Sequence, residues 1–477
     1  MKALEFIKQV QEGKIDIIKH TEEILDEAEN LNSEYNYFNI ISREEALRQA
    51  TVVEKLIAEN SSKKLLGLPV SVKDCICVRG VESRAGSKVL EGYVPLFDAV
   101  VVKKLREEGA IIIGKTSQDE FGFGSFSTNV GIGFGIPKNP FDKERSCGGS
   151  SGGSAGFTKM TNHVHVGIAE STGGSIVNPA SFCGVIGICP TYGRVSRYGL
   201  IDYANSLDKI GVMGKNLEDS AFVLEKISGY DKNDSTSANQ PVVNFHKFGK
   251  KIGNKKFRIG VIKEFMSKSE GVDKEIQEAV WKKIKKLESE GMAYEEVSLP
   301  INFKYGVQTY YLIAMAEAST NLAKYCGMRY GYSEKLEGNF NDFFTKTRTN
   351  SFGKEAKRRI IIGTFVRMAG YRDQYYGRAL SVRKKIVQEY KKLFGKFDCL
   401  VSPTMPFVAP KFDEIKKLTP LQNYMADIMT VGPNLAGLPH ISINAGEKEK
   451  MPVGMQIIAD HFKEKEIFDA ASVFENA

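Results

Sequence analysis

The chain has 477 residues, of which 42% are hydrophobic and 26% are charged. This composition excludes a disordered or fibrous protein and supplies enough apolar side chains for a large core. The formal net charge of +8 is mild for this length, so it does not require a nucleic-acid partner. The chain starts with a charged amphipathic pattern and has no apolar run near the roughly 20 residues that span a bilayer. We therefore expect a cytoplasmic protein without membrane contact.

The seven cysteines do not suggest a disulfide framework, because their number is odd and the chain is large. Cys75-Ile-Cys77 is too short for the usual zinc knuckle, and no second pair lies nearby. We expect buried free thiols, a reducing compartment and no metal site.

The first 60 residues have the pattern of helices. Apolar residues recur at helical spacing over residues 3–31, and Ser42-Arg-Glu-Glu45 has the form of a capping box that opens a helix to about Ile57. We predict an N-terminal helical layer over residues 1–60, followed by a core domain over residues 61–477.

The hydrophobic period changes to that of strands after residue 60. Leu68–Lys73 alternates as a strand does, a helix carrying Val101, Val102 and Leu105 follows, and Ala110–Gly114 is a second strand. Strand, helix and strand in this order predict parallel pairing with helices on the sheet faces. We therefore predict an α/β fold whose large mixed, mostly parallel central sheet is covered by helices on both faces. Further strands are expected at residues 257–262, 294–298, 399–401, 440–443 and 455–458.

Two segments, Cys147–Ser154 and Ser171–Ser175, place serine within runs of glycine. Glycine is retained in folded proteins where φ must be positive or where a group approaches the main chain closely. Two such turns can aim their N–H groups at one point, as the oxyanion of an acyl-transfer reaction requires. The pattern predicts an amide-cleaving serine enzyme.

Lys73 ends a predicted strand, where open parallel sheets gather their ligands. A lysine that faces inward there is either neutral, and then a competent base, or paired with a carboxylate. Asp74 and Glu120 are the candidate partners. The spacing alone leaves the neutral base and the ion pair open.

A histidine-dependent triad is the alternative to a lysine base. Gly149–Gly153 matches G-x-S-x-G with Ser151 in the middle, although any glycine-serine run satisfies this pattern. Of the six histidines, His440 is the only plausible triad member, since it begins a predicted strand. No Walker lysine follows a glycine-rich loop, so nucleotide binding is not expected.

Several motifs together resemble the amidase signature family. Further segments between Pro190 and Gly454 are similar, within that family, to the A subunits of tRNA-dependent amidotransferases, and the resemblance runs essentially from end to end. It implies the amidase signature fold. The motifs that carry the family resemblance are Gly67–Asp74, Gly148–Ala155, Thr172–Ile176 and Pro179–Gly184.

The resemblance implies a Ser-Ser-Lys triad, which needs no histidine. Ser175 matches the nucleophile, Lys73 the base, and Ser150 the bridging serine that follows a cis peptide bond. Ser175 would attack the side-chain amide of glutamine, and ammonia would leave from a glutamyl-enzyme that water then hydrolyses. The oxyanion hole would consist of the main-chain N–H groups of Thr172, Gly173, Gly174 and Ser175.

The resemblance also implies residues that select free glutamine. Arg359, or its neighbour Arg358, would grip the α-carboxylate with its two-pronged guanidinium group, and Asp427 would meet the α-ammonium. The other positions that match the glutamine pocket are Tyr310, or its neighbour Tyr311, and Gly124.

The implied enzyme is the glutaminase subunit of a heterotrimer. Its ammonia would convert Glu-tRNA(Gln), Asp-tRNA(Asn) or both into the amidated tRNA. A B subunit would activate the mischarged tRNA with ATP and Mg²⁺, and a small C subunit would bridge the other two, so no cofactor is expected in this chain. A free-standing small-molecule amidase of the same family is the alternative.

Overall fold

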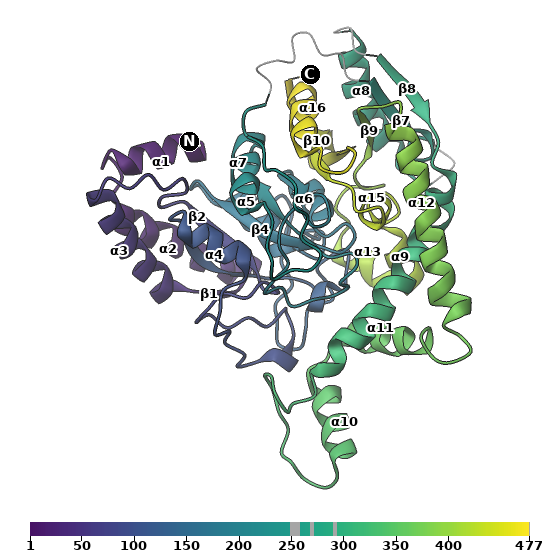
Figure 1. Cartoon of the computed structure of the whole chain (residues 1–477), viewed down its shortest axis with the longest axis horizontal. Helices are drawn as coiled ribbons and strands as arrows, with labels where there is room; N and C mark the ends of the chain where they lie inside the picture. Colours follow the sequence, from purple (N-terminus) through teal and green to yellow (C-terminus); the bar gives the residue numbers. More distant parts are fainter. Residues whose placement is uncertain (249–257, 268–270, 290–292, 477) are drawn as a thin grey trace.

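The computed structural model describes residues 1–248, 258–267, 271–289 and 293–476 (Figure 1). In this part of the chain, one sheet of 11 strands runs through the molecule in the order β1-β3-β2-β4-β6-β5-β10-β11-β9-β7-β8. Its strands are β1 (Phe38–Ile41), β2 (Pro69–Lys73), β3 (Ile111–Thr116), β4 (Val166–Ser171), β5 (Ile186–Cys189), β6 (Lys209–Gly214), β7 (Arg258–Ile262), β8 (Ala293–Val297), β9 (Cys399–Pro403), β10 (His440–Lys448) and β11 (Met451–Ile458).

Helices surround the sheet, so the predicted mixed α/β architecture is confirmed (Figure 1). The first three helices lie at the β1 end of the molecule, and α10 projects away from its body (Figure 1). The helices are α1 (Ala3–Gln11), α2 (Ile17–Tyr35), α3 (Arg43–Ala58), α4 (Val100–Glu107), α5 (Gly152–Met160), α6 (Val177–Cys183), α7 (Leu217–Ile227), α8 (Lys274–Ser289), α9 (Pro300–Asn321), α10 (Phe340–Ser351), α11 (Lys354–Phe365), α12 (Arg378–Phe394), α13 (Phe412–Lys417), α14 (Pro420–Met425), α15 (Val431–Leu435) and α16 (Glu464–Asn476).

The prediction of a mostly parallel sheet is wrong, because six of the ten strand pairings are antiparallel. The two strand-helix-strand units that the sequence indicated, β2-α4-β3 and β7-α8-β8, do have parallel strands. The C-terminal strands differ, since β10 and β11 are joined by Glu449 and Lys450, whose φ angles of 51° and 64° are those of a tight hairpin turn.

The N-terminal region contains a strand that the helical pattern concealed. The predicted helices are present, but Phe38–Ile41 forms β1 and pairs antiparallel with β3 at the sheet edge. The capping-box prediction is wrong, because the Ser42 hydroxyl donates to the carbonyl of Ile112 at 3.2 Å and makes no cap bond. A four-residue edge strand is too short to show a period of its own.

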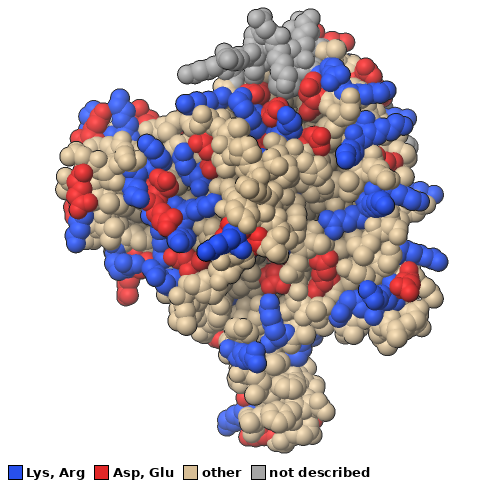
Figure 2. Space-filling view, viewed as in Figure 1, with Lys and Arg blue, Asp and Glu red and all other residues tan. Residues whose placement is uncertain are grey.

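The central strands β2 to β6 are buried along their whole length, so both faces of the sheet are covered there. None of the seven cysteines, all of which lie in the described ranges, forms a disulfide bond, and six of them are buried, as expected. Acidic and basic side chains are interspersed on the face drawn in Figure 2. Within the described ranges, no helix is both long enough and apolar enough to cross a bilayer.

Glu120 is a buried carboxyl group that joins two distant segments. Its oxygens accept hydrogen bonds from Ser87 Oγ at 2.5 Å and from the main-chain N–H of Gly353, which precedes α11, at 2.9 Å. Burial nevertheless raises the pKa of Glu120 to about 7. The folded protein therefore holds a proton that the unfolded chain releases near pH 4.5.

This raised pKa predicts that Glu120 lowers the stability of the folded protein as the pH rises. Its contribution to the free energy of unfolding should fall by about 3 kcal/mol between pH 4.5 and pH 8, since the folded state binds the extra proton only below its raised pKa. In Glu120→Gln that pH-dependent loss should be absent. Denaturant unfolding of both proteins at the two pH values measures the difference. If the wild type and Glu120→Gln lost the same free energy of unfolding between the two pH values, the Glu120 carboxyl group would have the same pKa in the folded and unfolded chains.

Candidate active site

Lys73 and Ser150, 77 residues apart, are in direct contact. Lys73 is the last residue of β2 and is fully buried, and its Nζ lies 2.8 Å from Ser150 Oγ. The peptide bond between Gly149 and Ser150 is cis, as the resemblance implied. The structure thus brings two of the three predicted triad residues together.

Ser175 lies in the turn between β4 and α6, and only 6% of its surface is exposed. The Ser150 segment and the start of α6, which follows the Ser175 turn, meet at Ser125. The Ser125 carbonyl accepts a hydrogen bond from Gly149 N at 2.9 Å and another from Asn178 Nδ2 of α6 at 2.8 Å. The first glycine-serine segment and the helix that follows the second are therefore held on the same loop.

Glycine in the turn before Ser175 allows two side chains to pack directly against the main chain. A Cβ atom at Gly173 would lie 3.0 Å from Tyr310 Oη, and one at Gly174 would overlap Thr430 Oγ1. The amide of Asn434 donates to the carbonyl of Thr172 and fixes the start of the same turn. The backbone of the predicted oxyanion hole is thus shaped by close packing.

Arg359 lies inside the site, whereas its neighbour Arg358 faces outward. Both belong to α11, and their side chains are 2% and 38% exposed, respectively. Arg359 Nη1 donates to Tyr203 Oη at 2.6 Å and its Nε to Glu355 Oε1 at 2.9 Å. Arg358 instead borders an outer cavity of about 510 Å³. The rings that surround the Arg359 guanidinium are those of Phe123, Tyr203, Tyr311 and Tyr424.

Asp427 is held by two hydroxyl groups. Its Oδ2 accepts from Tyr311 Oη at 2.7 Å and from Ser125 Oγ at 2.8 Å, while burial raises its pKa. Tyr310 and Tyr311 therefore both line the site, the first against the Gly173 turn and the second against Asp427. Ser125, which the sequence did not single out, links Asp427 to the Ser150 segment and to α6, the helix that follows the Ser175 turn.

Gly124 lies next to Ser125, and a Cβ atom there would lie about 2.5 Å from the carboxylate oxygens of Asp119. Asp119 accepts from the main-chain N–H groups of Ser127 and Asn129 and so shapes the loop that carries Ser125. The structure gives Gly124 this packing role.

The carboxylate beside Lys73 is neither of the two that its sequence neighbourhood suggested. Lys73 Nζ lies 2.9 Å from Glu170 Oε2 and 2.9 Å from the Glu170 carbonyl, while Asp74 pairs with Lys115 and Glu120 joins Ser87 to Gly353. The parallel pairing of β2 with β4 brings the ends of these strands together. A glutamate at the second-to-last position of a mostly apolar strand, just before the Ser175 turn, was the signal that could have identified it.

The contacts of Lys73 fit both protonation states of its amine. An ammonium has three N–H donors, which Ser150 Oγ and the two Glu170 oxygens would satisfy. A neutral amine has two N–H donors and one lone pair, which Glu170 and the Ser150 hydroxyl would satisfy equally well. In its neutral form, the Lys73 amine is therefore placed to receive the hydroxyl hydrogen of Ser150, whereas in the ion pair it is not.

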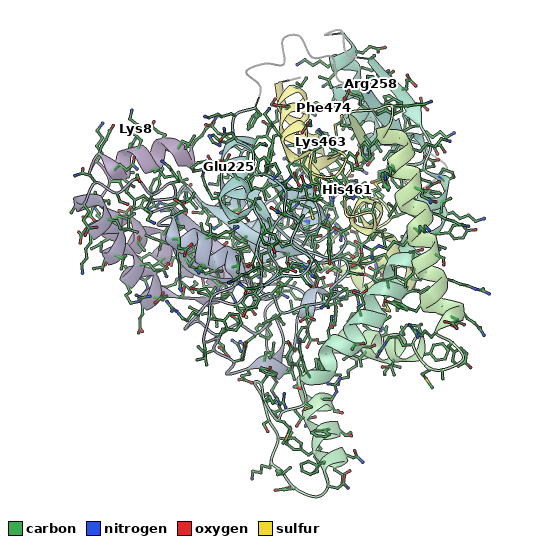
Figure 3. All side chains as sticks on the ribbon, in the orientation of Figure 1. Lys8, Glu225, Arg258, His461, Lys463 and Phe474 are labelled. Carbon is green, nitrogen blue, oxygen red and sulfur yellow. The ribbon has the colours of Figure 1, made fainter. Side chains whose placement is uncertain are left out.

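The histidine alternative does not match the structure. His440 is buried, its Nδ1 lies 3.1 Å from the Leu438 carbonyl, and burial lowers its pKa well below the usual value. His461, labelled in Figure 3, contacts the Ala436 carbonyl through Nε2 at 2.9 Å. The Ser151 hydroxyl donates to the Glu170 carbonyl at 3.1 Å. Among these groups, the nitrogen in contact with a serine hydroxyl is that of the Lys73 amine.

Comparisons with known proteins agree with this arrangement. Residues 19–468 match the family described as Amidase. The A subunit of glutamyl-tRNA(Gln) amidotransferase from Trichodesmium erythraeum is 43% identical over 464 residues, which cover 96% of this chain and 94% of the relative. The protein with the same name from Clostridium botulinum is 42% identical, with 96% and 93% covered.

Solved structures show the same fold. The A subunit of glutamyl-tRNA(Gln) amidotransferase from Thermotoga maritima superposes with a TM-score of 0.77 at 35% identity, covering 96% of this chain and 92% of its own. A chain of a vestigial protein complex related to the origins of an s-triazine catabolic enzyme gives a TM-score of 0.86 at 26% identity, with 100% and 98% covered. With a family match over residues 19–468 and relatives above 40% identity along nearly the whole chain, the protein belongs to the amidase family.

Proposed function

We propose that this chain is the glutamine-hydrolysing A subunit of a tRNA-dependent amidotransferase. The observation that carries the proposal is the contact between Lys73 Nζ and Ser150 Oγ, beside the turn that ends at Ser175. The names of the relatives from Trichodesmium erythraeum, Clostridium botulinum and Thermotoga maritima support the choice of substrate over that of a free-standing amidase.

The reaction would begin at the side-chain amide of glutamine. Ser175 Oγ attacks the carbonyl carbon, Ser150 takes the Ser175 proton, and the Ser150 proton moves to Lys73 Nζ. Main-chain N–H groups of the turn bind the oxyanion. The proton then returns through Ser150 to the leaving nitrogen, so ammonia departs and a glutamyl ester remains on Ser175. Water hydrolyses this ester by the same proton path.

Two buried charges support recognition of free glutamine. Arg359 presents its guanidinium within an aromatic cage, and Asp427 presents a carboxyl group beside Tyr311. Glutamine carries an α-carboxylate and an α-ammonium, so one arginine and one aspartate complement its two charges. We assign the carboxylate contact to Arg359 and the ammonium contact to Asp427, with Tyr310 and Gly124 as further wall positions.

The proposed partners are a B subunit, which would activate Glu-tRNA(Gln) or Asp-tRNA(Asn) with ATP and Mg²⁺, and a small bridging C subunit. Exposed apolar side chains support an assembly, because large apolar groups on a surface mark contact sites. Leu336, in the loop before α10, and Phe340, the first residue of α10, are 64% and 59% exposed, and Ile361 on α11 is 69% exposed. Cytoplasmic location is part of the same proposal.

The deciding experiment measures ammonia release from glutamine by this chain, alone and assembled with the B and C subunits. We expect glutamine hydrolysis by the complex, and amidated tRNA when ATP and a mischarged tRNA are added. Hydrolysis of small amides by the isolated chain, with no glutamine dependence and no partner binding, would instead establish a free-standing amidase.

Replacing Arg359 tests glutamine recognition. Arg359→Ala should raise the KM for glutamine more than about tenfold, because the charge-assisted bonds to the α-carboxylate are lost. Arg358→Ala is the matched control, since this neighbour is exposed, and its KM should change little. Transamidation with free ammonia should be retained in both. A larger effect at Arg358 would move the assignment to that residue.

A further inference from the structure

The Lys73–Glu170 pair is one end of a longer chain of buried polar groups. Glu170 Oε1 lies 2.9 Å from Thr172 Oγ1, which in turn lies 2.9 Å from Asp208 Oδ1. Glu170 and Asp208 are 3% and 0% exposed. A continuous path of contacts therefore runs from Asp208 through Thr172, Glu170 and Lys73 to Ser150.

A count of hydrogens at Thr172 shows that this path holds an extra proton. A threonine hydroxyl has one hydrogen and can donate it to only one of the two carboxyl oxygens. For the other contact to be a hydrogen bond, the carboxyl group must be the donor. One of the two buried acids is therefore protonated.

Asp208 is the better candidate for that proton. Burial, together with the charge of Glu170, raises its pKa well above the usual value. A protonated Asp208 donates to Thr172, Thr172 donates to Glu170, and Glu170 is left ionised opposite the Lys73 amine. The threonine thus orients the Glu170 carboxylate toward the base.

We propose that Glu170 is a positioning residue that holds a proton for Lys73. The ammonium–carboxylate pair and the amine–carboxylic acid pair differ only in the position of one proton between Nζ and Oε2, 2.9 Å apart. In a buried site the two forms lie close in free energy, because desolvation destabilises the charged form. Lys73 can therefore become a base without exchanging a proton with solvent. This inference rests on the proposed function.

Every proton that is transferred in the proposed reaction has a donor and an acceptor. The proton moves from Nζ to Oε2 and leaves a lone pair on Nζ. When the bond from Ser175 Oγ to the substrate carbon forms, Ser150 takes the Ser175 proton and gives its own to Nζ. When the carbon–nitrogen bond breaks, the same proton returns through Ser150 to the leaving nitrogen. Lys73 is then neutral again, with Glu170 still protonated for the hydrolysis of the ester.

Other ionisable groups face this path. Near Lys73 and Glu170 they are Asp119 from the loop after β3, Cys75 after β2 and Cys189 of β5. At the other end of the path, the charges of Arg197 and Asp202 act on the carboxyl group of Asp208. Burial raises the pKa of Asp119 to about 6 and raises the pKa of both thiols. Lys73 is the ammonium that Glu170 contacts directly.

The test compares the pH dependence of glutamine hydrolysis in the complete complex for the wild type and Glu170→Gln. In the wild type, activity falls at low pH when a second proton enters the Lys73–Glu170 pair, because Nζ then has no lone pair. In Glu170→Gln, the acidic limb of the pH profile reports protonation of the Lys73 amine alone. It should move upward by at least about one pH unit, and the rate at pH 7 should fall at least about tenfold.

Glu120→Gln is the matched control, since it changes a buried glutamate whose contacts are Ser87 and Gly353. Its acidic limb should stay in place. Transamidation with free ammonia reports folding and assembly of each variant. If Glu170→Gln does not assemble, Glu170→Asp replaces it, with a lower rate and an unmoved limb expected because the carboxyl group is kept.

Three results would overturn the inference: a wild-type profile in Glu170→Gln, a faster Glu170→Gln enzyme, or a limb that moves in Glu170→Asp. A wild-type profile in Glu170→Gln would mean that Glu170 has only a structural role. A faster Glu170→Gln enzyme would mean that Glu170 inhibits Lys73. The third shows that the carboxyl group does not set the limb. Each leaves the proposed function intact as long as the wild-type complex releases ammonia from glutamine. A wild-type complex without glutaminase activity contradicts the proposed function itself.

Discussion

Ser175→Ala should abolish glutamine hydrolysis, with a fall in kcat of at least roughly a thousandfold, because no other group forms the acyl-enzyme. Ser175 ends the turn whose Gly173 and Gly174 are packed against Tyr310 and Thr430, so the methyl group of alanine fits without rearrangement. Transamidation driven by free ammonia should continue. Ammonia release from glutamine and amidation of mischarged tRNA with each nitrogen source measure the two activities.

Ser151→Ala separates this prediction from a hydrolase elbow. Ser151 occupies the middle of G-x-S-x-G, yet its hydroxyl donates to the Glu170 carbonyl. We expect Ser151→Ala to keep glutaminase activity within about tenfold of the wild type. If Ser151→Ala were inactive while Ser175→Ala retained turnover, the two serines would exchange roles. Loss of ammonia-driven transamidation in Ser175→Ala would mean that this variant is misfolded or unassembled.

Lys73→Met should also lose glutamine hydrolysis, by roughly a hundredfold or more, because the proton of Ser150 then has no acceptor. Methionine has a similar length but no amine, and the Glu170 carboxyl group would be left to take up a proton. Single-turnover formation of the glutamyl-enzyme should be slowed to the same extent as steady-state turnover. Raising the pH should not restore the rate.

Lys115→Met is the matched control for this variant. Lys115 is a second fully buried lysine, on the adjacent strand β3, with its Nζ 3.6 Å from Asp74 and 2.7 Å from Ser83 Oγ. Lys115→Met should lower the free energy of unfolding but leave the kcat of the folded protein unchanged. Wild-type turnover in Lys73→Met would remove Lys73 as the base, and equal loss in both variants would indicate a structural cause.

Much of the site could be predicted from the sequence because its chemistry is carried by short local motifs. The glycine-serine runs around Ser150 and Ser175 specify tight turns, and the alternation before Lys73 specifies a strand. The contact between Lys73 and Ser150 follows once these turns pack beside that strand, and the structure contains it. The motifs left a histidine triad as an alternative, and the structure argues against it, since His440 has no serine partner among the described contacts.

Strand direction could not be predicted in the same way. The alternation of side chains between the two faces of the sheet is the same in β10 and β11 whether the strands run parallel or antiparallel. The two-residue turn at Glu449 and Lys450 makes them antiparallel. Likewise, Arg358 and Arg359 are adjacent in sequence but about 100° apart around α11. The packing of that helix against α9 decides which one is buried.

The sequence by itself determined the family, the candidate triad of Lys73, Ser150 and Ser175, and the glycine turns around its two serines, because each depends on residues a few positions apart. Only the tertiary structure decided that Lys73 meets Glu170, 97 residues away, and that Thr172 connects Glu170 to Asp208. The partner of a buried charge is set by which strands lie side by side and in what register. No local pattern encodes that choice, since Asp74 and Glu120 also carry carboxyl groups and are closer to Lys73 in the chain.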